Sequence, residues 1–159
     1  MKTKIEVKEV EREDLVNLFS GLSSDDYFRV NLDDFFFKAR QKNVTFPKDC
    51  KCIEDKVAYY LELGGKILIT DYCSEEDDEP YTDKGMKVNG IINYAVDLED
   101  IRNGIQDALN GEFKHNDDEN NVDWARESAY NLAYAPENFD ADNVTALIQV
   151  ILFNEIIYA

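Results

Sequence analysis

The hydrophobic and polar residues of this chain follow two different periods. Residues 4–8 and 27–32 alternate apolar and polar positions with the period of two that is typical of a half-exposed β-strand. Residues 66–72 are rich in β-branched and aromatic side chains and predict a further strand. Asn89-Gly90 is a turn signal within a strand-like stretch and predicts a hairpin over residues 86–96.

Elsewhere apolar residues recur every three to four positions, which is the spacing of an amphipathic helix. This spacing predicts helices over residues 11–22, 35–41, 53–63, 97–111, 124–134 and 142–153. Asp97 and Asp140 precede two of these segments as N-cap residues, and Asp33 or Asp34 is the expected cap of the second.

The expected core follows from the helical stripes and the strands. Inward-facing side chains are predicted at the following positions: Leu15, Leu18, Phe19, Leu22, Phe28, Val30, Leu32, Ile53, Val57, Tyr60, Leu61, Ile101, Ile105, Leu109, Val144, Leu147, Ile148, Ile151 and Leu152. Strands and helices do not alternate strictly, which favours an α+β fold. We therefore predict one domain over residues 1–159, with a small, mainly antiparallel sheet packed against several helices.

Composition refines this prediction. A chain of 159 residues with 44% hydrophobic residues can bury one core. The odd number of cysteines, three, argues against a disulfide framework, and the first residues show no secretory signal, so we expect a cytoplasmic protein. Residues 144–153 are too short and too interrupted to span a membrane, and we expect no membrane partner.

Charge is distributed unevenly along the chain. Residues 1–70 carry 13 acidic and 12 basic side chains, a net charge of −1, whereas residues 71–159 carry 21 acidic and 5 basic, a net charge of −16. The change occurs at the stretch SEEDDEPYTD, residues 74–83. Such an imbalance concerns partners and solubility rather than fold. The candidate binding residues are Asp71, Glu75, Glu76, Asp77, Asp78, Glu79, Asp83, Asp117, Asp118 and Glu119.

Familiar catalytic motifs are missing from the sequence. The chain has one histidine and contains no phosphate-binding glycine loop, dinucleotide fingerprint or nucleophile elbow, so we predict a protein that is not an enzyme and needs no cofactor. Cys50, Cys52, Cys73 and His115 lack the spacing of a zinc site. Residues 116–127 only weakly resemble the oxygen ladder of a calcium loop, and we predict no metal.

We therefore predict an accessory protein that acts through protein–protein binding, with a basic protein surface as its partner. A sharper hypothesis is a DNA-mimic inhibitor from a phage or mobile element, because dense carboxylates can compete for a groove built to hold phosphates. Direct nucleic-acid binding is disfavoured, since the basic residues form no stripe.

Two alternatives remain open. The first is a carboxylate-based, metal-dependent, nuclease-like enzyme that uses Asp71, with an acid and a lysine in the segment 54–56. The second is a homo-oligomeric structural protein that associates through the apolar segments 35–37 and 151–158.

Overall fold

The computed structural model describes residues 9–115 and 118–158, and the strand predicted over residues 4–8 lies outside these ranges. The described residues form six α-helices and one antiparallel sheet of four strands. The elements in chain order are α1 (Arg12–Leu22), β1 (Phe28–Val30), α2 (Leu32–Gln41), α3 (Ile53–Glu62), β2 (Ile67–Asp71), β3 (Gly85–Val88), β4 (Ile91–Val96), α4 (Leu98–Asn110), α5 (Glu119–Tyr134), a 3₁₀ turn η1 (Pro136–Asn138) and α6 (Ala141–Phe153). The predicted α+β class is confirmed.

The strands lie in the order β1-β2-β4-β3, and every neighbouring pair is antiparallel. Because side chains alternate along a strand, Ile67, Ile69 and Asp71 of β2 share one face with Ile92 and Tyr94 of β4. These five side chains are buried. The predicted hairpin is confirmed, since Asn89 and Gly90 take left-handed φ angles of 53° and 79° at its turn.

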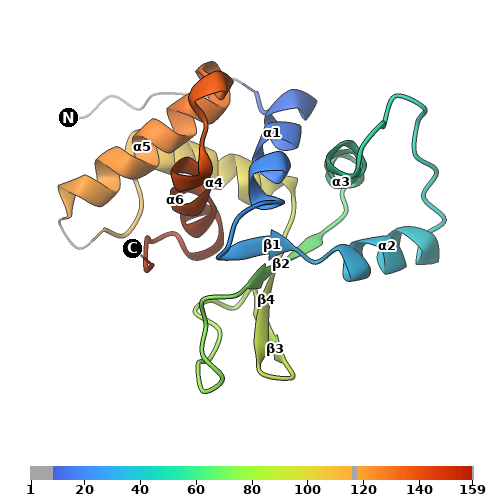
Figure 1. Cartoon of the computed structure of the whole chain (residues 1–159), viewed down its shortest axis with the longest axis horizontal. Helices are drawn as coiled ribbons and strands as arrows, with labels where there is room; N and C mark the ends of the chain where they lie inside the picture. Colours follow the sequence, from blue (N-terminus) through green and yellow to red (C-terminus); the bar gives the residue numbers. More distant parts are fainter. Residues whose placement is uncertain (1–8, 116–117, 159) are drawn as a thin grey trace.

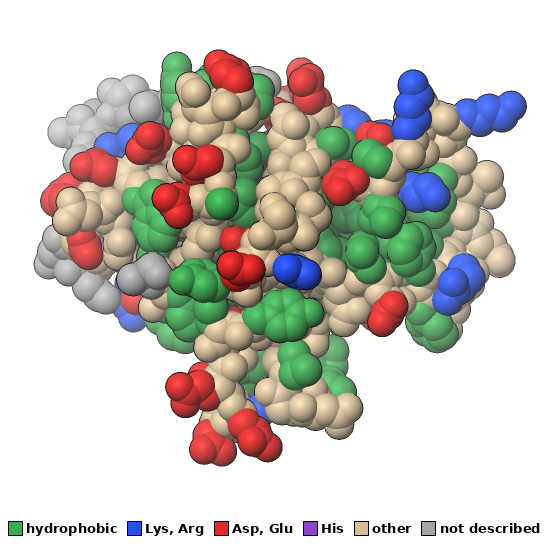
Figure 2. Space-filling view, in the orientation of Figure 1, with side chains coloured by type: hydrophobic (Ala, Val, Ile, Leu, Met, Phe, Trp, Pro, Cys, Tyr) green, Lys and Arg blue, Asp and Glu red, His purple; other side chains and the backbone are tan. Residues whose placement is uncertain are grey.

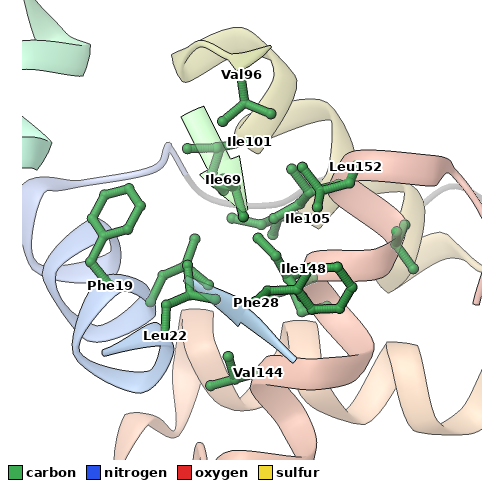
Figure 3. Packing of buried hydrophobic residues seen from close by; sticks show 14 of the residues in the cluster. Phe19, Leu22, Phe28, Ile69, Val96, Ile101, Ile105, Val144, Ile148 and Leu152 are labelled. Carbon is green, nitrogen blue, oxygen red and sulfur yellow. The ribbon is translucent and has the colours of Figure 1, made fainter. Parts of the chain in front are cut away.

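Helices α1, α4 and α6 cover this inner face, and α5 packs against α4 and α6 (Figure 1). Figure 3 shows side chains from α1, α4 and α6 converging on Phe28 of β1 and Ile69 of β2. The Phe153 ring lies 5.9 Å from that of Phe28 and 5.0 Å from that of Tyr94, between centroids. One hydrophobic core therefore joins the helices to the sheet.

The predicted caps are partly right. Asp97 and Asp140 accept hydrogen bonds from the backbone N–H groups of Asp100 and Asn143, as expected of N-caps. The predicted cap of α2 is wrong, because Asn31 holds this position and accepts from the backbone of Asp34 at 3.1 Å. Strand β1 ends at Val30, and this early end places Asn31 where a cap is needed.

Three expectations about apolar residues are corrected. Ile53, expected inside, is 42% exposed because it is the first residue of α3, and Leu32 opens α2 at 37% exposure instead of continuing β1. The apolar segments expected to join copies of the chain are mostly internal: Phe35 and residues 151–153 are buried, and only Phe37 is prominently exposed at 57%.

Residues 156–158 are held against the core. The Gln149 side chain accepts hydrogen bonds from the backbone N–H groups of Ile157 and Tyr158, and its Nε2 donates to the Tyr158 carbonyl at 3.0 Å. These hydrogen bonds tie the segment to α6. In the described part of the chain, the longest and most apolar helices still fall short of what a bilayer crossing requires.

Candidate acidic interaction surface

The acidic loop, defined as residues 74–83, is fastened to the fold at several points. The backbone N–H of Tyr81 donates to the Tyr94 hydroxyl at 3.0 Å, and the Tyr81 ring packs edge-on against Phe153. At Gly85, where the loop meets β3, an added Cβ would lie 2.6 Å from Pro80, so the chain passes too closely for a larger residue. The loop therefore presents its side chains from a defined backbone.

The carboxylates of this loop point to solvent. Glu75, Glu76, Asp77, Asp78 and Glu79 are exposed, as is Asp83. The neighbouring Lys87 leaves their side chains unpaired, because its ammonium binds the backbone carbonyls of Glu76 and Asp78 instead. The Asp78 carboxylate accepts from the backbone N–H of Glu75 at 2.7 Å and closes a turn. A lysine thus fixes the loop without neutralising its carboxylates.

The assignment of Asp71 to the acidic surface is wrong. Its side chain is 2% exposed, because the alternation along β2 turns it to the inner face, opposite Phe28 and Ile92. Its Oδ1 accepts from the backbone N–H groups of Cys73 and Ser74, and its Oδ2 accepts from the Tyr158 hydroxyl at 2.9 Å. Burial raises the pKa of Asp71, and these hydrogen bonds oppose the shift only in part.

The buried Asp71 carboxylate affects its neighbours as well. Burial first, and then the charges of Asp71 and Asp25, raise the pKa of the Cys73 thiol to about 11. Burial, and after it the hydrogen bond to Asp71, raises the pKa of the Tyr158 hydroxyl. Asp71 therefore serves the attachment of residues 156–158 to the sheet and is not available to a partner.

The remaining predicted residues lie at the start of α5. Asp118 is its N-cap and accepts from the backbone N–H groups of Asn120 and Asn121, and Glu119 is exposed in the first turn. Asp117 lies outside the described residues. Residues 119–127, which would complete a calcium loop, are helical, so the oxygen ladder does not form there.

The structure also reveals a pocket that the sequence analysis missed. It has a volume of about 420 Å³ and lies between the segment 24–27, α5 and the first turn of α6. Its walls include the half-buried Trp124, Tyr27, and the carboxylates of Asp25, Asp26 and Asp142, and no lysine or arginine lines it. No sequence signal joined these residues, because Trp124 and Asp142 lie about a hundred positions beyond Asp25 and Asp26.

The acids around this pocket have different roles. Asp25 is 5% exposed and is satisfied by the backbone N–H groups of Tyr27 and Phe28 and by the Thr145 hydroxyl. Asp26 and Asp142 are exposed and line the pocket. An indole, a phenol and carboxylates suit a cationic group, because aromatic faces and anions both attract positive charge.

Figure 2 shows the distribution of charge over one side of the molecule. Carboxylates gather over α5 and α6 and, separately, at the lower end where the acidic loop projects. Lysine and arginine lie mainly over α2, α3 and the segment that joins them. On this side, the charge boundary found in the sequence is also a boundary in space.

A metal site is not assembled by the residues that the structure describes. Within residues 9–115 and 118–158, no three His, Cys, Asp or Glu side chains come together in a group that could hold an ion. Cys50 is buried, Cys73 is half-buried and Cys52 is exposed, and all three are free thiols.

Comparisons with known proteins do not add a function. The sequence matches no protein-family model, and neither a curated protein nor a solved structure is a significant match.

Proposed function

We propose that this protein is a non-catalytic accessory protein that binds a basic protein surface through the carboxylates of residues 74–142. One observation carries the proposal: all five basic side chains of residues 71–158 are engaged within the chain itself. Lys84 pairs with Asp100, Arg102 with Glu9 and Lys114 with Glu155, while Lys87 and Arg126 bind backbone carbonyls.

The consequence is a surface whose negative charge is not compensated locally. Within the described part of the chain, no lysine or arginine pairs with the loop carboxylates or with Asp26, Asp123, Glu127 or Asp142. A net charge of −16 over residues 71–159 attracts a positively charged partner and repels negatively charged molecules. Such attraction mainly accelerates association and selects partners of opposite charge.

The pocket beside Trp124 supports the same partner. A lysine or arginine side chain of the partner would find an aromatic face together with two exposed carboxylates there. The N-terminus of α6 carries a partial positive charge of about half an elementary charge, which repels a cation. The negative charge of the two carboxylates is larger, so the pocket still favours a cation.

The test is capture from a lysate of the source organism with the immobilised protein, at roughly 50 and 300 mM salt. We expect one or a few basic proteins to be retained at low salt, released at high salt and identified by mass spectrometry. A loop variant with E75Q, E76Q and D77N, and a pocket variant with D26N, W124A and D142N, should retain several-fold less.

The matched control removes three exposed carboxylates from the other part of the chain, with E13Q, D49N and E62Q. It should retain the partner as the unmodified protein does. Equal losses in all three variants would mean that only total charge matters, and retention of no basic protein at low salt would refute the proposal.

The DNA-mimic hypothesis stays a prediction that the same experiment can test. If the captured protein binds DNA and the acidic surface occupies its DNA groove, a short DNA duplex should displace it in proportion to the duplex concentration. Retention that is insensitive to the duplex would exclude this form of the proposal.

A further inference from the structure

The face of the sheet that turns away from the helices carries a shallow depression of about 520 Å³. The strand register places Met86 beside Asn93 and Thr70 in one row, and Val88 beside Ile91 in the next. Tyr72, which directly follows β2, extends this second row. We call this surface the outer sheet face, and it is defined by Leu68, Thr70, Tyr72, Met86, Val88, Ile91 and Asn93. Arg29 and Asp33, which carry opposite charges, line the depression as well, together with Val30, Asn31, Leu32 and Asn89.

The rim of the outer sheet face is unusually apolar for an exposed surface. Tyr72 is 57% exposed, Met86 52%, Val88 51% and Ile91 46%. Four large apolar side chains at this exposure lie together on two adjacent rows rather than singly, which marks an interaction site.

The floor of the depression offers an unused hydrogen-bond donor. Asn93 is 9% exposed, and its Oδ1 accepts from the Thr70 hydroxyl at 2.6 Å and from the Asn31 amide at 3.3 Å. These two bonds fix the orientation of the amide, and within the described residues its Nδ2 donates to no protein acceptor. The Nδ2 atom reaches solvent, and a carbonyl oxygen of a bound segment would replace water as its acceptor.

The acidic loop lies directly behind this face. Lys87, which points to the opposite side of β3 from Met86 and Val88, holds the loop through the carbonyls of Glu76 and Asp78. At the hairpin turn, Glu76 Cγ lies 3.6 Å from the position that a Cβ on Gly90 would take. The same hairpin therefore presents apolar side chains on one side and carboxylates at its edge.

From this combination we infer that the outer sheet face docks a segment of the basic partner in which apolar side chains are flanked by lysine or arginine. The apolar side chains fill the depression, a carbonyl oxygen accepts from Asn93 Nδ2, and the flanking cations meet the acidic loop. The inference rests on the proposed function, because it takes the basic character of the partner from there.

Charge decides between this occupant and a second copy of the chain. Two copies joined at this face would bring two acidic loops, each with a run of five consecutive carboxylates, to the edges of one interface. At a net charge of −17 per chain, the repulsion opposes self-association, whereas a basic segment gains from the same field.

A random 12-residue peptide library displayed on phage, selected against the immobilised full chain at low salt, tests the inference. We expect enriched peptides to combine apolar residues with flanking lysine or arginine. Their synthetic forms should bind roughly tenfold more weakly to an M86Q/V88T/I91T variant, which keeps strand-compatible side chains but removes the apolar rim.

The matched control is L63Q/Y130Q, which changes two apolar side chains as exposed as those of the rim: Leu63, 58% exposed just after α3, and Tyr130, 52% exposed on α5. It should alter the affinity less than about twofold. In a ¹⁵N spectrum, the side-chain amide signal of Asn93, assigned by its loss in N93L, should shift on addition of the peptide.

The outcomes separate this inference from the proposed function. Peptides that require salt-sensitive contacts with the loop but bind the rim variant normally would overturn docking on the outer sheet face, as would failure to enrich any peptide. Peptides that require the rim, lack basic residues and bind with an affinity independent of salt would refute the proposal that the partner is basic. Sedimentation that shows a dimer dissociated by the rim variant would assign the face to a second copy.

Discussion

Replacing Tyr158 by phenylalanine would remove one hydroxyl and leave the ring in place. That hydroxyl donates a hydrogen bond to Asp71 Oδ2 at 2.9 Å. The ring itself packs 6.0 Å from Phe28 and 6.2 Å from Phe153, between centroids, and phenylalanine keeps both contacts. The substitution therefore isolates one hydrogen bond to a carboxyl group that is 2% exposed.

The expected loss of unfolding free energy at neutral pH is about 1.5–3 kcal/mol, the usual range for a hydrogen bond to a charged group. Burial raises the pKa of Asp71, so protonation of Asp71 stabilises the fold at low pH and this contribution is lost as the pH rises through its folded-state pKa. The hydrogen bond from the Tyr158 hydroxyl stabilises the ionised carboxylate of Asp71, so it reduces the stability that the fold loses when Asp71 ionises. In Y158F the pKa of Asp71 should rise further, and the destabilisation should shrink to about 0.5–1.5 kcal/mol once Asp71 is protonated.

Urea unfolding followed by fluorescence, at about pH 7.5 and again at about pH 4, near the ordinary aspartate pKa, measures both values. The double variant D71N/Y158F completes a mutant cycle, in which the coupling between the two residues should account for most of the loss at neutral pH. Y130F is the control, because Tyr130 is 52% exposed, and it should change stability by less than about 0.5 kcal/mol. A loss below that size for Y158F, or a loss that is equal at both pH values, would refute the role assigned to this contact.

Three further outcomes follow from the same packing. D140A removes the cap that accepts from the Asn143 backbone at 3.0 Å and should lower the urea midpoint by an amount equivalent to about 0.5–2 kcal/mol; no loss would mean that the α6 cap contributes nothing. G104A adds a Cβ that would lie 2.4 Å from Ile151 between α4 and α6, and should cost about 1–3 kcal/mol in thermal unfolding unless those helices can separate freely. The pKa of about 11 leaves roughly one Cys73 thiol in a thousand ionised at about pH 8, so mass spectrometry should find its alkylation by iodoacetamide far slower than that of an ordinary cysteine; a normal rate would contradict the burial.

The case of Asp71 shows how far sequence reasoning reaches at a single position. Its charge and its place beside the acidic loop suggested a surface residue, yet the alternation Ile67, Ile69, Asp71 already put it on the buried face. What the sequence could not supply was the partner that makes burial tolerable. Tyr158 is 87 residues away and reaches Asp71 only because α6 and the segment after it return to the sheet.

The candidate surfaces divide in the same way. The charge boundary near residue 71 and the exposed carboxylates of residues 75–79 could be predicted, because charged side chains in a turn-rich segment almost always remain in water. The pocket around Trp124 and the outer sheet face could not, because each is assembled from segments whose proximity depends on how helices and strands pack.

The sequence by itself determined the α+β class, the position of most helices, the hairpin at Asn89-Gly90 and the two aspartate caps, since these depend on local periodicity and on backbone groups within four residues. It also determined the asymmetry of charge. Only the tertiary structure decided which carboxylates are buried, that the basic side chains of the second part are all engaged, and that one face of the sheet remains uncovered, because burial and pairing depend on contacts between residues far apart in the chain.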